Sequence, residues 1–238
     1  MGYVWQSTVI MVIFCNLAGA NTTTFTMTQL DRIKEKLKLL KKTDSSFSQF
    51  GAARHKYLFK PPLSFDRIQK FEKDNEIKLP AEYVRFMTEI GNGGAGPFYG
   101  LEPLENSLYD DLDKKNKDSL LTPSKPFIHS SAWNLKFEPT VDADKEDLYA
   151  NQLKNFEKEY FDNKHMNGVI AICNYGCAVS INLVVSGDEY GNIWTDDRAS
   201  DYGIHPSQEL GNTGRITFLD WYERWLDDSL SEIENANE

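Results

Sequence analysis

Acidic side chains are the most numerous groups in this chain that could take part in chemistry. Its 238 residues contain 36 Asp and Glu against 26 Lys and Arg, which gives a net charge of −10. Four carboxylates that are close in sequence could be imagined as cation ligands: Asp188, Glu189, Asp196 and Asp197. They lack the alternating oxygen spacing of a calcium loop, and abundance alone gives no acid–base geometry. We interpret these four residues as exposed carboxylates of a hairpin, and therefore predict no metal site and no catalytic residue.

The glycines and cysteines give equally little support to a reactive centre. Gly91-Asn92-Gly93-Gly94 could be imagined around a phosphate, but no Lys-Ser/Thr follows and no helix begins there. Cys173 and Cys177 have C-x-x-x-C spacing, and no second Cys/His pair completes a zinc site. Two reduced thiols packed as small hydrophobic groups are expected, since a disulfide would suit only an exported chain. With no nucleophile elbow, P-loop, H-E-x-x-H or dinucleotide motif, we predict a non-enzymatic protein without a cofactor.

The glycine run is better explained as the end of a helix. Pro80 suits a first helical turn, and apolar residues then recur at steps of three and four. The residues of this stripe are Tyr83, Phe86, Met87 and Ile90. Residues 91–94 accept a positive φ and end the helix. A short aromatic strand over residues 98–101 is expected to follow.

A second amphipathic helix is predicted over residues 28–42. Thr28 is a plausible N-cap with Asp31 three residues later. Its inward stripe is Leu30, Ile33, Leu37 and Leu40. Residues 31–78 carry a net charge of +6, whereas residues 79–238 carry −16. A solvated basic face on a core-packed helix is favoured over a membrane or nucleic-acid surface, because the acidic remainder would repel a phosphate backbone.

The second half of the chain is predicted to form an antiparallel sheet between helices. Residues 169–172 are apolar on both faces and predict a central strand, whereas residues 178–185 alternate and predict one more buried face. Gly187 and Gly191 indicate a tight turn, and short turns join antiparallel strands. A helix over 148–161 is expected to face inward with Leu148, Leu153, Phe156 and Tyr160. Together these elements predict an α+β fold with helices at both ends.

Several of these segments together resemble one known family. Leu79-Pro80 opens a helix that Asn92-Gly93-Gly94 closes, and Tyr99-Gly100-Leu101 follows. Residues 168–177 resemble the central hairpin of the SUKH-domain family, and residues 186–197 resemble its Gly-x-x-x-Gly-x-x-Trp hairpin. The helix over 217–225 lies where the family has its last helix. The resemblance spans about residues 28–230 and implies a single SUKH-like domain over 27–230, with a central twisted antiparallel sheet, followed by an acidic tail over 231–238.

The resemblance implies a role in binding rather than catalysis. The superfamily includes bacterial immunity proteins, which bind and block toxin domains, and yeast regulators of cell-wall synthesis. A cytoplasmic immunity protein that occludes its cognate toxin is the leading hypothesis, and a regulatory interaction scaffold is the alternative. Many such toxins are nucleases with basic channels, which an acidic face would complement. The predicted partner-binding residues are Glu102, Glu105, Asp110, Asp111, Asp196 and Asp197. Direct binding to nucleic acid or membrane is not expected.

The first 26 residues form an uncharged segment with more than one interpretation. An apolar run over 9–15 precedes Ala18-Gly19-Ala20, the pattern of a signal peptide cleaved after Ala20, although no basic residue precedes it. The run is too short for a membrane span, which needs roughly 20 apolar residues. Translation from Met27 is the other main alternative. An exported protein, of a different functional class, would follow only if residues 1–20 act as a signal.

Overall fold

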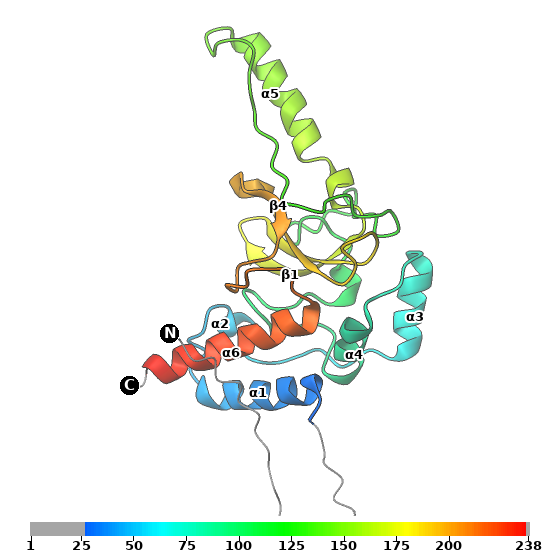
Figure 1. Cartoon of the computed structure of the whole chain (residues 1–238), viewed down its shortest axis with the longest axis vertical. Helices are drawn as coiled ribbons and strands as arrows, with labels where there is room; N and C mark the ends of the chain where they lie inside the picture. Colours follow the sequence, from blue (N-terminus) through cyan, green and yellow to red (C-terminus); the bar gives the residue numbers. More distant parts are fainter. Residues whose placement is uncertain (1–26, 237–238) are drawn as a thin grey trace, which may run out of the picture.

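A four-stranded antiparallel sheet at the centre of the molecule sets the positions of the other elements (Figure 1). The structure is a computed structural model that describes residues 27–236, so both interpretations of the N-terminal segment lie outside it. The predicted α+β fold with helices at both ends is confirmed. The helices and strands are α1 (Gln29–Thr43), α2 (Ala52–His55), α3 (Phe65–Asp74), α4 (Ala81–Glu89), α5 (Glu146–Tyr160), β1 (Val169–Gly176), β2 (Val179–Val184), β3 (Ile193–Asp197), β4 (Gly203–Pro206) and α6 (Phe218–Ala236).

The strand expected at the centre of the sheet lies at its edge. The strand order is β1-β2-β3-β4, so β1 has only one strand beside it. Its other side is covered by residues 99–107, through hydrogen bonds from Glu102 N to Ile172 O (2.8 Å) and from Ala171 N to Ser107 O (2.8 Å). An edge covered in this way is not available to another chain. The prediction was wrong because a non-strand segment can bury an edge strand as completely as a neighbouring strand does.

The aromatic segment over residues 98–101 is a turn and not the predicted strand. Phe98 has a φ of 53°, and only Leu101 makes isolated bridges. Gly94 and Leu101 exchange two backbone hydrogen bonds of 2.8 and 2.9 Å, so the chain between them folds back as a loop. The preceding helix is confirmed as α4, with Pro80 as its N-cap.

The sheet is covered on both faces, which corrects the expectation for β2. The main core packs α1, α4 and α6 against one face, and every residue of β2 is buried. A smaller core on the other face contains Trp194 from β3, and Phe127 and Met166 from the loops that cover it. Alternation along residues 178–185 therefore does not separate a buried face from an exposed one.

Helix α1 is confirmed, with the predicted inward residues buried and with Thr28 and Asp31 forming a capping box. Part of its basic face is paired, whereas Lys38, Lys41 and Lys42 are exposed to solvent as predicted. Arg32 donates two hydrogen bonds of 2.9 Å to Glu223 on α6, and Lys36 contacts the same carboxylate at 2.9 Å. Partial burial opposes ionisation of Glu223, but these two cations lower its pKa. The opposite charges of the N-terminal region and the rest of the chain therefore meet partly in this helix pair.

Helix α5 exists where predicted, and Tyr160 is buried as expected, but Leu148 is exposed and Leu153 and Phe156 are only partly buried. Tyr160 is its only buried residue, and the side chain of Leu148 is 55% exposed. The helix projects from the body beside the extended chain that precedes it, so it has no core to face along most of its length (Figure 1).

Replacing the carboxylate that joins α1 to α6 tests the importance of this contact. We expect Glu223→Gln to lower the free energy of unfolding by about 1 kcal/mol, and the melting temperature by about 2–4 °C, since both cations are partly exposed. Because the folded-state pKa is lowered, the contribution is present above pH 4.5 and is lost as the pH falls through that lowered value. Thermal melting from pH 7 to pH 3 should show a smaller acid-induced loss in the variant. An unchanged loss would contradict this account.

Candidate partner-binding surface

Four of the six predicted partner-binding carboxylates lie in the segment that follows α4. Glu102 is buried, accepts a hydrogen bond from Asn106 (2.9 Å) and forms an ion pair with Lys115 (3.2 Å). Glu105 is about half exposed and accepts a hydrogen bond from Asn92 (2.8 Å). Partial burial would raise the pKa of Glu105, but the amide of Asn92 and nearby positive charge lower it. These two side chains therefore have clear roles in holding the loops around β1.

Asp110 and Asp111 shape the turn that follows. Asp110 accepts a hydrogen bond from the hydroxyl of Ser119 at 2.5 Å. Asp111 accepts backbone hydrogen bonds at residues 113 and 114 and contacts the Lys114 ammonium at 3.3 Å. These bonds outweigh the effect of partial burial and lower the pKa of Asp111.

Asp196 and Asp197 are the last two residues of β3, and so belong to the sheet and not to the segment that follows α4. Asp196 binds the guanidinium of Arg198 at 2.8 and 2.7 Å. One buried oxygen of Asp197, Oδ1, has no hydrogen-bond partner among the described residues. The six carboxylates therefore fall into two groups. Four of them, Glu102, Glu105, Asp111 and Asp196, form ion pairs with cations, and that of Glu105 with Lys60 is the longest at 3.8 Å. Contact between the six and a partner stays a prediction.

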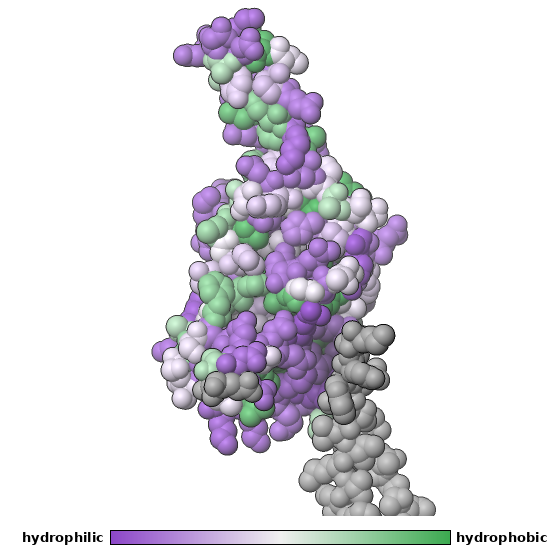
Figure 2. Space-filling model, turned by 60° about the vertical axis from the view of Figure 1, so that its left-hand side comes forward, coloured by the Kyte–Doolittle hydropathy of each residue, from purple (hydrophilic) through white to green (hydrophobic). Residues whose placement is uncertain are grey.

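A projecting arm, residues 134–160, is the most exposed substructure of the molecule (Figures 1 and 2). It consists of an extended segment and α5, held together by Phe137, whose ring lies 5.5 Å from that of Tyr149 and 5.3 Å from that of Phe156. Two hydrogen bonds of 2.8 Å join Thr140 and Gln152. Few contacts hold the two segments, so the arm depends on its base for orientation.

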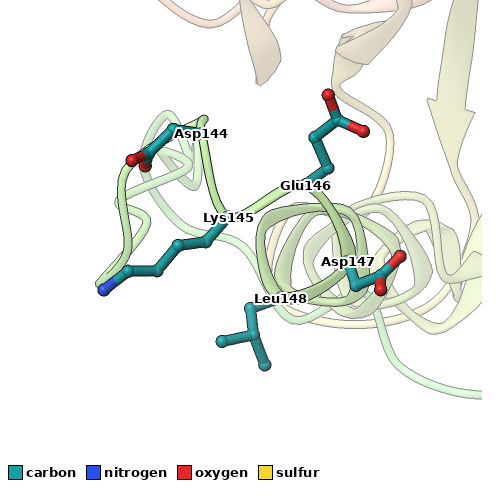
Figure 3. Close-up of a pocket in the computed structure, with 5 residues that line it drawn as sticks. All are labelled: Asp144, Lys145, Glu146, Asp147 and Leu148. Carbon is teal, nitrogen blue, oxygen red and sulfur yellow. The ribbon is translucent and has the colours of Figure 1, made fainter.

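The free negative charge of the arm is concentrated at its end, residues 138–148, which we call the acidic tip. Five carboxylates and one lysine give the tip a net charge of −4. None of these six side chains makes an ion pair within the described range 27–236. Figure 3 shows the side chains of residues 144–148 spread outward around an open hollow. The carboxylates at positions 142, 144, 146 and 147 are visible in the sequence, but their spacing matches no motif that would set them apart from other exposed acidic residues.

Aromatic and histidine rings anchor the base of the arm. Trp133 stacks on His165 with ring centroids 4.2 Å apart, and lies 5.6 Å from Tyr160 at the end of α5. The ring of His129 lies 5.9 Å from that of His165, and both histidines are buried. Arg198 adds a hydrogen bond of 2.8 Å to the carbonyl of Tyr160. The base of the arm is therefore held by ring packing and a hydrogen bond, whereas the charged side chains of the acidic tip make no ion pairs within the described residues.

The comparison with family models matches residues 62–209 to the SMI1 / KNR4 family (SUKH-1). The chain belongs to this family. The match spans α3 to β4 and includes the arm, whereas α1, α2 and α6 of this SUKH protein lie outside the matched residues. No curated protein and no solved structure matches the chain.

The cysteines of this SUKH protein differ in environment. Both Cys173 and Cys177 are free thiols, but only Cys173 is buried as expected. Cys177 is exposed because it lies in the two-residue turn between β1 and β2, where it has a φ of 54°. Within residues 27–236, no group of three potential ligands could hold a metal ion. None of the helices described there combines the length and apolarity needed to cross a membrane.

The buried His129 makes the base of the SUKH arm sensitive to pH. Burial is the main cause that lowers the pKa of His129. Positive charge on His165 and Arg198 lowers this pKa further, whereas the nearby carboxylate of Asp196 raises it. The neutral ring therefore contributes stability that is present above about pH 6.5, the ordinary histidine value, and is lost as the pH falls below it. We expect His129→Phe to reduce the loss of thermal stability between pH 7 and pH 5.

The half-buried His205 of β4 supplies the matched control. The loss of thermal stability between pH 7 and pH 5 should be smaller in His129→Phe than in His205→Phe. Hydrogen exchange of α5, corrected for the intrinsic exchange rate at each pH, should show lower protection at pH 5 than at pH 7, and a smaller change in His129→Phe. Equal pH dependence in all three proteins would contradict a role of His129.

Proposed function

We propose that this SUKH protein is an immunity protein, which binds a cognate toxin domain and blocks its active site. Membership of the SMI1 / KNR4 (SUKH-1) family is the observation that carries the proposal. The shape of the described surface supports it, because a projecting arm suits recognition of a protein better than capture of a small molecule, for which enclosed apolar pockets are typical. In this proposal the protein is not an enzyme and acts in the cytoplasm.

Electrostatic complementarity is the physical basis that we propose for toxin blocking. A nuclease toxin has a basic channel for its substrate, and the acidic tip offers carboxylates that no cation of the described chain neutralises. Such charges speed the encounter and compete with the phosphates of the substrate. The tip therefore takes the leading role in binding, and the exposed loop carboxylate Glu105 takes a secondary one.

Rescue from toxicity is the direct test of immunity. We expect the full chain to bind the product of the adjacent gene in a one-to-one complex, and to restore growth of cells that express this product. Binding is measured by isothermal titration and rescue by colony counts, with an unrelated SUKH protein as the control. A well-folded chain that neither binds nor rescues would contradict immunity and favour the regulatory-scaffold alternative.

Neutralising the acidic tip tests the proposed electrostatic mechanism separately from the proposed role in immunity. The tip variant changes its five carboxylates to amides, at Glu138, Asp142, Asp144, Glu146 and Asp147. We expect its association rate with the toxin to fall at least tenfold, and its rate to depend less on salt, because screening acts on long-range attraction.

A control variant of equal net charge makes this comparison specific. Its five substitutions are at exposed carboxylates outside the arm that make no ion pair in the described structure: Glu35, Asp66, Glu76, Asp118 and Asp188. This control loses the same total charge but keeps the tip carboxylates, so it should bind within about threefold of the unmodified chain. Equal loss in the two variants would reject the tip and leave immunity standing.

A further inference from the structure

A second exposed surface, which we call the aromatic corner, lies outside the arm. It consists of Phe50, Tyr99 and Tyr175 with the guanidinium of Arg54. The three ring-bearing residues are 62%, 37% and 39% exposed. Exposed aromatic residues that gather in one place mark interaction sites more often than scattered ones do. This surface uses none of the groups in the proposed electrostatic contact with a toxin.

Three distant segments converge to build the corner. The ring of Phe50, which precedes α2, lies 5.3 Å from that of Tyr99 in the loop after α4. The backbone N–H of Tyr99 donates to the carbonyl of Asn174 at the end of β1 (3.3 Å). In the same loop and hairpin, the rings of Phe98 and Tyr175 are 4.4 Å apart. Phe50 and Tyr99 are thus in contact with each other, Tyr175 contacts Phe98, and none of the three exposed rings is isolated.

Close packing fixes the positions of these rings. A Cβ atom at Gly176 would lie 2.8 Å from the ring of Tyr99, and one at Gly51 would collide with the carbonyl of Phe98. Below them, the buried carboxylate of Asp44 accepts hydrogen bonds from the hydroxyl of Tyr57 (2.6 Å) and from the backbone of residues 48 and 49 (2.7 and 3.1 Å). Rings held in this way lose little conformational entropy on binding.

Backbone strain is concentrated in the same region. Nine residues other than glycine have a positive φ in the described chain, and six of them lie within three positions in sequence of a corner residue. These six are Phe47, Lys56, Tyr57, Phe98, Cys177 and Ala178. Positive φ values cost energy for such side chains and tend to cluster where a surface has a function. The cluster of strained residues beside the aromatic corner therefore supports a role of this surface in binding.

The charge of the corner defines what it can bind. Five of the seven arginines make ion pairs within residues 27–236, but Arg54 does not. Its guanidinium lies 5.4 Å from the centre of the Tyr99 ring, a stacked position that leaves its N–H groups available to a carboxylate. The neighbouring Lys56 is also exposed and unpaired in this range. The corner is thus a cationic, aromatic surface on an acidic protein.

We propose that the aromatic corner is a docking site for a segment of another protein that presents a carboxylate beside an aromatic or aliphatic side chain. The carboxylate pairs with Arg54, and the apolar side chain packs on Phe50 and Tyr99. Tyr and Arg are the residue types that dominate binding energy at protein interfaces. Residues 1–26 of the chain contain no carboxylate and cannot supply this ion pair. The proposal is independent of toxin binding through the arm.

Selection from a random library of 12-residue peptides on the immobilised full chain tests this site. We expect enriched peptides to place Asp or Glu within three residues of an aromatic or aliphatic residue. A synthetic peptide of the enriched sequence should bind at least tenfold more weakly to Arg54→Glu and to Phe50→Ala, as measured by fluorescence polarisation. Melting curves of the variants establish that both remain folded.

Matched controls come from α3, where an exposed ring and an unpaired arginine occur without convergence. Phe65→Ala and Arg67→Glu remove the same residue types and should leave peptide affinity within about twofold. Absence of enrichment, enrichment without acidic residues, or equal loss in the α3 variants would overturn the proposal. Self-association of the chain, or binding to a poly(U) strand, that is abolished by Arg54→Glu would also overturn it by assigning the corner to a different occupant.

Discussion

Burial of the sheet on both faces is the constraint on which the rest of the structure depends. The four strands have two apolar faces and two edges that must be covered. Different segments of the chain cover each of them. Helices α1, α4 and α6 form the main core on one face, and loops form the smaller core on the other. Residues 99–107 hydrogen bond along β1. These covering segments also place the functional surfaces, because the aromatic corner and the arm emerge where they meet the sheet.

Sequence patterns predicted the elements whose causes are local. The capping box and apolar stripe of α1 and the start of α4 at Pro80 depend on residues a few positions apart. The edge position of β1 was not predictable in this way, because its cover is attached by backbone hydrogen bonds from distant residues that leave no side-chain pattern. Helix α5 carries aromatic residues at helical spacing, yet they pack against a single extended segment and not a core. Periodicity indicates a helix with an apolar face but does not identify what covers that face.

The candidate site was less predictable than the fold, since the availability of a charge depends on its partners in space. Asp196 and Glu102 read as free carboxylates, but Arg198 and Lys115 neutralise them. Glu223 is paired with Arg32, which is 191 positions away. The acidic tip retains its charge because it projects beyond the reach of any cation in the body. Counting acidic residues along a sequence therefore says little about where an electrostatic surface lies.

The contribution of α6 to the main core also bears on how the protein is made. Phe218, Trp221, Tyr222 and Leu226 fill the space between the sheet and the other helices, yet they follow every strand in chain order. During synthesis on the ribosome, the sheet and α1 leave the exit tunnel before the residues that seal them. Nascent chains then expose apolar surface until the last helix docks, and products that stop before Phe218 have no closed core. The main core is therefore completed only once α6 has emerged from the ribosome, and a chain that lacks α6 exposes the apolar surface that chaperones and proteases recognise.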